Sequence, residues 1–114
     1  MAAPGTMTNI FFDLPTISAA RARAGKRYQE FLRAPAMSAG VYVLAPGSAD
    51  LQKPHREDEM YYVVRGRARM RVGEQEHVVR AGGVIFVAAE VKHYFFDISE
   101  ELELLVMIAP QESS

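Results

Sequence analysis

The chain has 114 residues, of which 49% are hydrophobic and 24% are charged, and this is the composition of one folded domain rather than of a disordered segment. Thirteen basic and fourteen acidic residues give a formal net charge of −1, so no strong electrostatic field attracts nucleic acid or an anionic membrane. Cysteine is absent, which excludes disulfides, thiolate metal sites and cysteine nucleophiles.

The apolar runs are too short to cross a membrane. The longest ones, at 84–89 and 104–109, have six residues each, whereas a membrane helix needs about twenty. No Lys or Arg precedes Arg21, and no continuous apolar stretch reaches the length of a signal peptide. These observations predict a cytoplasmic protein without a membrane partner.

The N-terminal third has few regular signals. Residues 1–9 lack periodicity, and we expect a loose tail there. Thr16 is a possible cap for a short helix over residues 18–24, which are rich in alanine and arginine, and Gly25 would end that helix.

From residue 40 onward the sequence predicts short strands that end at glycine or proline. Residues 67–72 alternate strictly between apolar and arginine side chains, and the neighbouring segments are β-branched and aromatic. We expect at least six strands between residues 40 and 109, no helix longer than two turns, and an all-β sandwich or barrel. The predicted strands are 41–45, 60–65, 67–72, 75–80, 84–88, 91–98 and 102–109.

One strand carries three arginines on a single face, at positions 67, 69 and 71. Glu74 and Glu76 lie on the expected partner strand, where they can neutralise the arginines across the hairpin. We therefore expect no nucleic-acid surface here. His77, next to the turn, is expected at the surface.

Two segments contain residues suited to metal binding, at 47–66 and 82–97. The first contains His55 and Glu59, and the second contains His93. Two imidazoles and one carboxylate suit a first-row divalent metal and leave coordination positions open, but this chemistry does not distinguish iron, manganese, nickel, cobalt and zinc. Each histidine also has a simpler interpretation: His55 as a solvated loop residue beside Pro54, and His93 as a core residue bonded to a backbone carbonyl.

The two segments resemble the paired motifs of the cupin superfamily. The first motif, G-x5-H-x-H-x3-4-E-x6-G, is matched in its second half by Glu59 and Gly66, with His55 at the second histidine. The second motif, G-x5-P-x-G-x2-H-x3-N, fits Gly82 and His93, whereas Ala88, Glu90 and Asp97 replace its Pro, Gly and Asn.

The first motif lacks one histidine, and its spacing allows two registers. In the register that we prefer, Lys53 occupies the place of the missing histidine, and its ammonium group has no lone pair to donate. In the other register Gln52 takes the place of the first histidine. Pro54, which cannot bind a metal, then takes the place of the second histidine. A kink at Pro54 could also turn the amide oxygen of Gln52 toward the metal, so Gln52 is a further candidate ligand.

The resemblance covers about residues 40–109 and implies a double-stranded β-helix, the cupin jelly-roll barrel, with a short N-terminal arm. We divide the single domain into an N-terminal arm with the first strands (1–36), the barrel (37–110) and a tail (111–114). Single-domain relatives commonly form homodimers through their N-terminal strands. The apolar residues Ile10, Phe11 and Phe12 are a plausible part of such an interface.

The resemblance implies a metal-dependent enzyme acting on a small molecule, either a dioxygenase or an isomerase or lyase. Glu59 or Lys53 would be the nearest acid or base, and the expected pocket walls are Tyr61, Phe95 and Lys53. Tyr61 and Phe95 fit an ordinary core equally well. A non-enzymatic metal- or ligand-binding cupin and a barrel with a vestigial site both stay open as alternatives.

Overall fold

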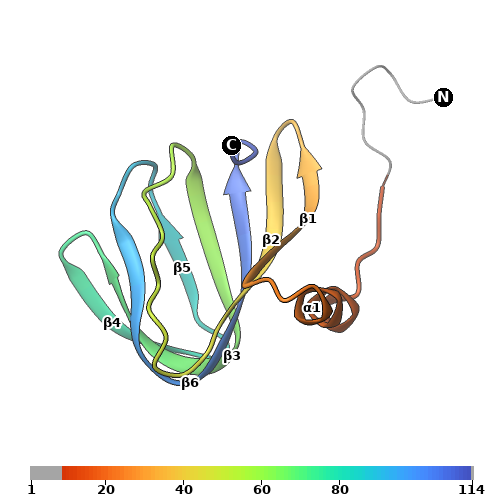
Figure 1. Ribbon diagram of the computed structural model, residues 1–114. Coiled ribbons are helices and arrows are strands. Elements are labelled where there is room, and N and C mark those ends of the chain that lie inside the picture. Colours follow the sequence, from red (N-terminus) through yellow and green to blue (C-terminus); the bar gives the residue numbers. More distant parts are fainter. Residues whose placement is uncertain (1–8, 114) are drawn as a thin grey trace.

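The structure is a computed structural model that describes residues 9–113 and is built mainly from antiparallel strands (Figure 1). The predicted tail at 1–9 lies almost wholly outside the described residues. The elements in chain order are α1 (Leu14–Arg23), β1 (Tyr28–Ala34), β2 (Met37–Leu44), β3 (Asp58–Val72), β4 (Gln75–Arg80), β5 (Val84–Val87) and β6 (His93–Ala109). No helix formed by these residues is long and apolar enough to span a membrane.

Two long strands, β3 and β6, pair with each other and bend together, so that each takes part in two layers. The first half of β3 pairs with β5 and with the second half of β6, which is joined in turn to β2 and β1. The second half of β3 pairs with β4 and with the first half of β6. The two layers form the arms of a U whose base is the shared bend (Figure 1).

The bend of β3 lies at Gly66. This residue has a φ of +98°, and register shifts flank it between Val63 and Arg69. A side chain would not fit, because a Cβ atom there would lie 2.1 Å from the carbonyl oxygen of Glu101 on β6. Glycine is therefore required both for its conformation and for the close approach of the two backbones.

The continuity of the bent strands corrects the predicted strand count. The segments predicted separately at 60–65 and 67–72 form the single strand β3, and those at 91–98 and 102–109 form β6. From residue 40 to 109 the structure therefore has five strands, β2 to β6, and the expectation of at least six was wrong. The all-β class and the absence of a long helix in this range are as predicted.

The helix α1 begins earlier than predicted. Asp13, rather than Thr16, is its N-cap, and the Asp13 carboxylate accepts a hydrogen bond of 3.1 Å from the Thr16 backbone N–H. Thr16 supports the cap with its hydroxyl, which also contacts the carboxylate. The helix ends at Arg23, just before Gly25, which has a φ of +68°.

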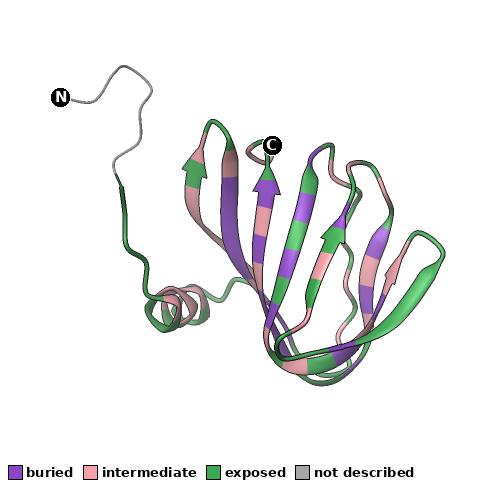
Figure 2. Cartoon of the chain, turned by 180° about the vertical axis from the view of Figure 1, so that it is seen from behind, coloured by how far each residue is buried: buried purple, intermediate pink, exposed green. Residues whose placement is uncertain are grey.

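The core lies between the two layers, and alternation along the strands supplies its side chains (Figure 2). Of the apolar side chains that alternate with the arginines at 67–72, Ala68 and Met70 are buried and Val72 is half-buried, whereas the arginines point outward. Glu76 pairs with Arg71 at 2.9 Å and with Arg69 at 3.7 Å, as the hairpin predicted. The buried core cluster consists of Leu44, Tyr61, Val63, Ala68, Met70, Val79, Val87, Phe95, Ile98, Leu102, Leu104, Val106 and Ile108.

The outer face of the larger layer is unusually apolar. Met60 and Tyr62 on β3 lie opposite Phe86 and Val84 on β5, and all four side chains are exposed. In the described chain the segment before α1 also exposes Ile10, Phe11 and Phe12, and Phe12 makes an edge-to-face contact with Phe31 of β1.

Candidate metal centre

Glu59 is the second residue of β3, and the alternation of the strand directs its side chain into the interior. The residue is only 3% exposed. Its Oε1 atom lies 2.8 Å from His93 Nε2 and 3.0 Å from the Tyr61 hydroxyl. A buried carboxylate is costly unless it is paired, and these two partners supply the pairing.

His93 is the first residue of β6 and reaches Glu59 from the opposite layer. It is 2% exposed, and its Nδ1 lies 2.9 Å from the carbonyl oxygen of Val91. Because a carbonyl only accepts hydrogen bonds, Nδ1 carries a proton, and Nε2 is the nitrogen presented to the interior. Burial alone lowers the pKa of His93, but the hydrogen bonds to Glu59 and Val91 and the nearby negative charges outweigh it and raise the pKa above its usual range.

His55 comes from the irregular loop between β2 and β3. Its carbonyl accepts a hydrogen bond of 2.7 Å from the backbone N–H of Glu90, which anchors this loop to the turn before β6. Its ring is half-buried, with Nε2 3.6 Å from Glu59 Oε2 and Nδ1 3.1 Å from a carboxylate oxygen of Glu112. His55 is therefore not a solvated loop residue, although its ring is not fully buried either.

Two replacements in the second motif occupy left-handed backbone conformations. Glu90 stands where the motif has glycine and has a φ of 70°, and Asp97 stands where it has asparagine and has a φ of 49°. Glycine, asparagine and aspartate tolerate this conformation, whereas glutamate is strained in it. The Glu90 turn keeps its shape, since its backbone N–H still reaches His55.

The three side chains form a group that could hold a single metal ion. Among the described residues, His55, Glu59 and His93 form a group in which one ligand atom from each lies within 4.8 Å of the others. Two ligand atoms about 2.1 Å from a metal and at right angles to each other are about 3 Å apart. His93 Nε2 lies 2.8 Å from Glu59 Oε1, which is near that value, and His55 Nε2 lies 3.6 Å from the other oxygen, Oε2. Two imidazoles and one carboxylate would leave positions open for water or substrate.

Tyr61 and Gln52 form a hydrogen-bonded layer beside these three residues. The Tyr61 hydroxyl lies 2.8 Å from Gln52 Oε1 and 3.1 Å from His93 Nε2. Burial, followed by the charge of Glu59, raises the pKa of Tyr61 well above its usual range, so the phenol stays protonated. Gln52 points inward, but Tyr61 engages its oxygen and its Nε2 donates to Asp50 at 2.7 Å.

A cavity of about 290 Å³ opens onto the site. Lys53 lines it from the loop, whereas Phe95 packs against Tyr61, where the two rings make an edge-to-face contact at 5.2 Å. The lining residues are Arg27, Tyr28, Tyr42, Leu51, Gln52, Lys53, His55, Glu59, Tyr61, Val106, Ile108 and Glu112.

Sequence reasoning missed the cavity residues that lie outside the two motifs, above all Tyr28 and Glu112. Tyr28 crosses the inner face of β2 at Gly40, where a Cβ atom would lie 2.3 Å from the tyrosine ring. A glycine inside a strand is the one signal for such a close approach. The Tyr28 hydroxyl is buried and makes no hydrogen bond within the described residues.

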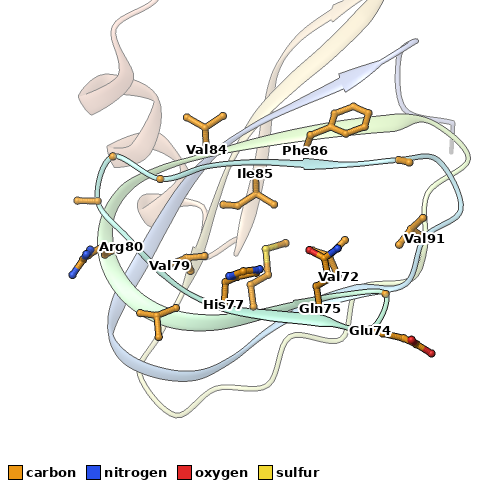
Figure 3. Close-up of a pocket in the computed structure, with 17 residues that line it drawn as sticks. Val72, Glu74, Gln75, His77, Val79, Arg80, Val84, Ile85, Phe86 and Val91 are labelled. Carbon is orange, nitrogen blue, oxygen red and sulfur yellow. The ribbon is translucent and has the colours of Figure 1, made fainter.

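A larger recess of about 1130 Å³ lies between β4 and β5 (Figure 3). His77, which is exposed as predicted, lines it together with Val79, Ile85 and Phe86. None of the three grouped ligand-type residues lies in this recess, so the smaller cavity is the better candidate for chemistry.

Comparisons with known proteins agree with this architecture. A family model described as "Cupin domain" matches residues 40–108. An uncharacterised protein of Streptomyces coelicolor is 46% identical over 102 residues, which cover 90% of this chain and 97% of that protein.

Solved structures show the same fold. A Thermus thermophilus protein is 27% identical, with a TM-score of 0.69, over 89% of this chain and 97% of its own. An RmlC-like cupin with a double-stranded β-helix from Methanocaldococcus jannaschii is 19% identical, with a TM-score of 0.66, over 73% of this chain and 78% of its own. These matches confirm the predicted fold.

Proposed function

The chain belongs to the cupin family, and from this premise we propose that it is a small metal-dependent enzyme that holds one divalent ion through His55, Glu59 and His93. The observation that carries the proposal is the convergence of three ligand-type side chains, from a loop and from two opposed strands, beside a cavity that His55 and Glu59 line. Buried ionisable groups that converge in a cavity are typical of functional sites.

The bound ion would supply Lewis acidity at its open positions and, if it is iron, a place for dioxygen to react. The protein's own residues would orient the ligands of the ion and enclose the site. Tyr61 holds Glu59 in place, and the two layers exclude bulk water from the carboxylate. Lys53 lies at the exposed side of the cavity, where its ammonium can bind an anionic group of a substrate or return a proton to it.

The cavity favours a small substrate with both apolar and polar parts. Its volume is near the lower end of the range for ligand pockets. Leu51, Val106 and Ile108 offer apolar contacts. The Tyr28 hydroxyl offers a hydrogen-bond donor that the described residues leave unused. Such a lining suits a dioxygenase or an isomerase or lyase acting on a small oxygen-bearing molecule.

The first test is metal binding. The protein, purified without a chelator or an affinity tag, should contain a divalent metal by elemental analysis. His93→Ala should weaken the affinity of the metal-free protein for Zn²⁺ or Mn²⁺ more than tenfold in calorimetry, because one of three ligands is lost. The circular dichroism spectrum should not change, since a barrel of this size does not need a metal to fold.

His77→Ala is the matched control, because His77 is an exposed histidine outside the site. This variant should bind metal like the wild type. Equal metal affinities in wild type, His55→Ala and His93→Ala would contradict the metal centre and leave a ligand-binding or structural barrel.

The second candidate function is non-enzymatic binding, for sensing or storage. The observation that favours it is the missing motif histidine: Lys53 is exposed at the preferred position, and the amide of Gln52 is already engaged by Tyr61 and Asp50. Dioxygen consumption or turnover of a candidate substrate by the metal-loaded protein would favour the enzyme. Metal and ligand binding without turnover would favour the binding module.

We also propose that the chain forms a homodimer in which residues 10–12 of one copy cover the outer face of the other. The arm and the face of Met60, Tyr62, Val84 and Phe86 are both apolar and both exposed. Leaving both in water is unfavourable for a single chain. Light scattering should give a mass near twice 12.7 kDa. A monomer at tens of micromolar would refute this assembly.

A further inference from the structure

The last described residues, 111–113, fold back over the cavity, although the sequence suggested only a tail. The backbone N–H of Glu112 donates to Ser38 Oγ at 3.0 Å, and the Ser113 hydroxyl donates to Glu57 at 3.0 Å. Arg33 adds a bond of 2.7 Å to the side chain of Gln111. These contacts, to β1, to β2 and to the residue before β3, hold the segment in one place.

This docking brings the Glu112 carboxylate to the candidate metal centre. One of its oxygens lies 3.1 Å from His55 Nδ1, and the residue lines the cavity. The other ring nitrogen of His55, Nε2, faces Glu59. Glu112 is not part of the group of three mutually close ligand-type residues. Its place is therefore behind His55, on the side away from the other two ligands.

The two histidines are held in the same manner by different acceptors. His93 directs Nδ1 to the carbonyl of Val91 and Nε2 to the interior, and His55 directs Nδ1 to Glu112 and Nε2 to the interior. Val91 precedes His93 by two residues, so that acceptor is local. His55 lies in a loop without regular structure, and its acceptor comes from the other end of the barrel sequence.

We propose that Glu112 is a positioning residue for His55: it accepts the Nδ1–H bond and thereby fixes the ring and the tautomer in which Nε2 is free to bind a metal. This inference rests on the proposed metal centre. Ligating histidines almost always donate their second ring N–H to a carboxylate, carbonyl or water, and loss of such a partner typically costs about 10- to 100-fold in metal affinity.

The test compares Glu112→Ala and Glu112→Gln with the wild type, and with Glu100→Ala as a control at an exposed acidic residue on β6. Calorimetry of the metal-free proteins with Zn²⁺ should show an affinity about 10- to 100-fold lower for Glu112→Ala. Glu112→Gln should lose less, because its amide oxygen still accepts the Nδ1–H bond. Glu100→Ala should equal the wild type. Unfolding of the metal-free proteins shows whether any variant fails to fold.

A second measurement does not require a metal. Nitrogen-15 NMR of the imidazoles in metal-free protein at about pH 8.5, where free imidazoles are neutral, should show His55 with its proton on Nδ1. In Glu112→Ala that proton should move to Nε2, and in Glu112→Gln it should stay on Nδ1.

Two results would overturn the proposal: an affinity of Glu112→Ala within twofold of the wild type, or a wild-type His55 with its proton on Nε2. If the wild type binds no metal, the proposed function fails, and the proton position on His55 still decides whether Glu112 orients the ring.

Discussion

Replacing Gly66 with alanine tests whether the bend shared by β3 and β6 requires a bare backbone. The new Cβ atom would lie 2.1 Å from the carbonyl oxygen of Glu101 and 2.7 Å from the Cα of Leu102. Both are main-chain atoms of β6, so no side-chain rotation can relieve the overlap, and the paired strands must separate locally.

The expected cost has two parts. A left-handed conformation costs a non-glycine residue about 1–2 kcal/mol. Overpacking of a filled site adds about 1–3 kcal/mol. The sum, about 2–5 kcal/mol, is a large part of the 5–15 kcal/mol that typically stabilises a domain. Gly82→Ala provides the comparison, because Gly82 has a similar φ of +92° but a Cβ atom there would meet nothing within 4 Å. Gly82→Ala should therefore lower the free energy of unfolding by the conformational part alone.

Urea denaturation of metal-free protein, followed by circular dichroism, measures both variants. We expect the free energy of unfolding to fall by at least about 1 kcal/mol more in Gly66→Ala than in Gly82→Ala. Equal losses in the two variants would refute the close approach of β3 and β6 at the bend.

Three further predictions concern the residues around the site. Tyr61→Phe should lower the free energy of unfolding, measured in urea, by about 1.5–3 kcal/mol, because Glu59 loses a buried hydrogen bond. Tyr62→Phe, on the exposed face, is the control and should change the free energy of unfolding by less than about 0.5 kcal/mol. Glu90→Gly should raise the melting temperature, since it relieves a φ of 70°, and Glu90→Ala should not; a rise in both would argue against backbone strain. The pKa of His93 is raised in the fold, so its protonated form stabilises metal-free protein below a pH of about 6.5, and this contribution should fade as the pH rises through the raised pKa. Denaturation midpoints between pH 6 and 9 should show this fall in the wild type, and a fall of equal size in His93→Gln would count against it.

The fold was predictable because its signals are local: glycines end most strands, and buried and exposed residues alternate along them. The inward residues of β3 are Tyr61 and Val63 before Gly66, and Ala68 and Met70 after it, so the phase of the alternation changes at the bend. The two strands predicted at 60–65 and 67–72 reproduce this phase change, because they separate the chain at Gly66. They do not show that the chain continues as one strand, because that depends on pairing with β6, which is distant in sequence.

The candidate site was predictable only for the residues whose spacing in the sequence matches the two motifs. His55, Glu59 and His93 lie at fixed offsets from Gly66 and Gly82, and in the structure one ligand atom from each lies within 4.8 Å of the others. Nothing local marks Glu112, because its position depends on hydrogen bonds to distant elements. Contacts of this kind leave no periodicity in the sequence.

The pairing of Glu59 with His93 has a consequence for the motions of the barrel. Glu59 belongs to the larger layer and His93 to the smaller one, and both lie far along the arms of the U from the bend that joins them (Figure 1). The turn at 88–92 already joins the two layers here, because it links β5, whose Val87 pairs with Glu59, to the start of β6 at His93. An ion held by Glu59 and His93 would add a second crosslink between the two arms at this end. Any fluctuation that spreads the arms would then have to break a coordination bond, so ion binding would slow amide hydrogen exchange in both layers, including strands that contribute no ligand.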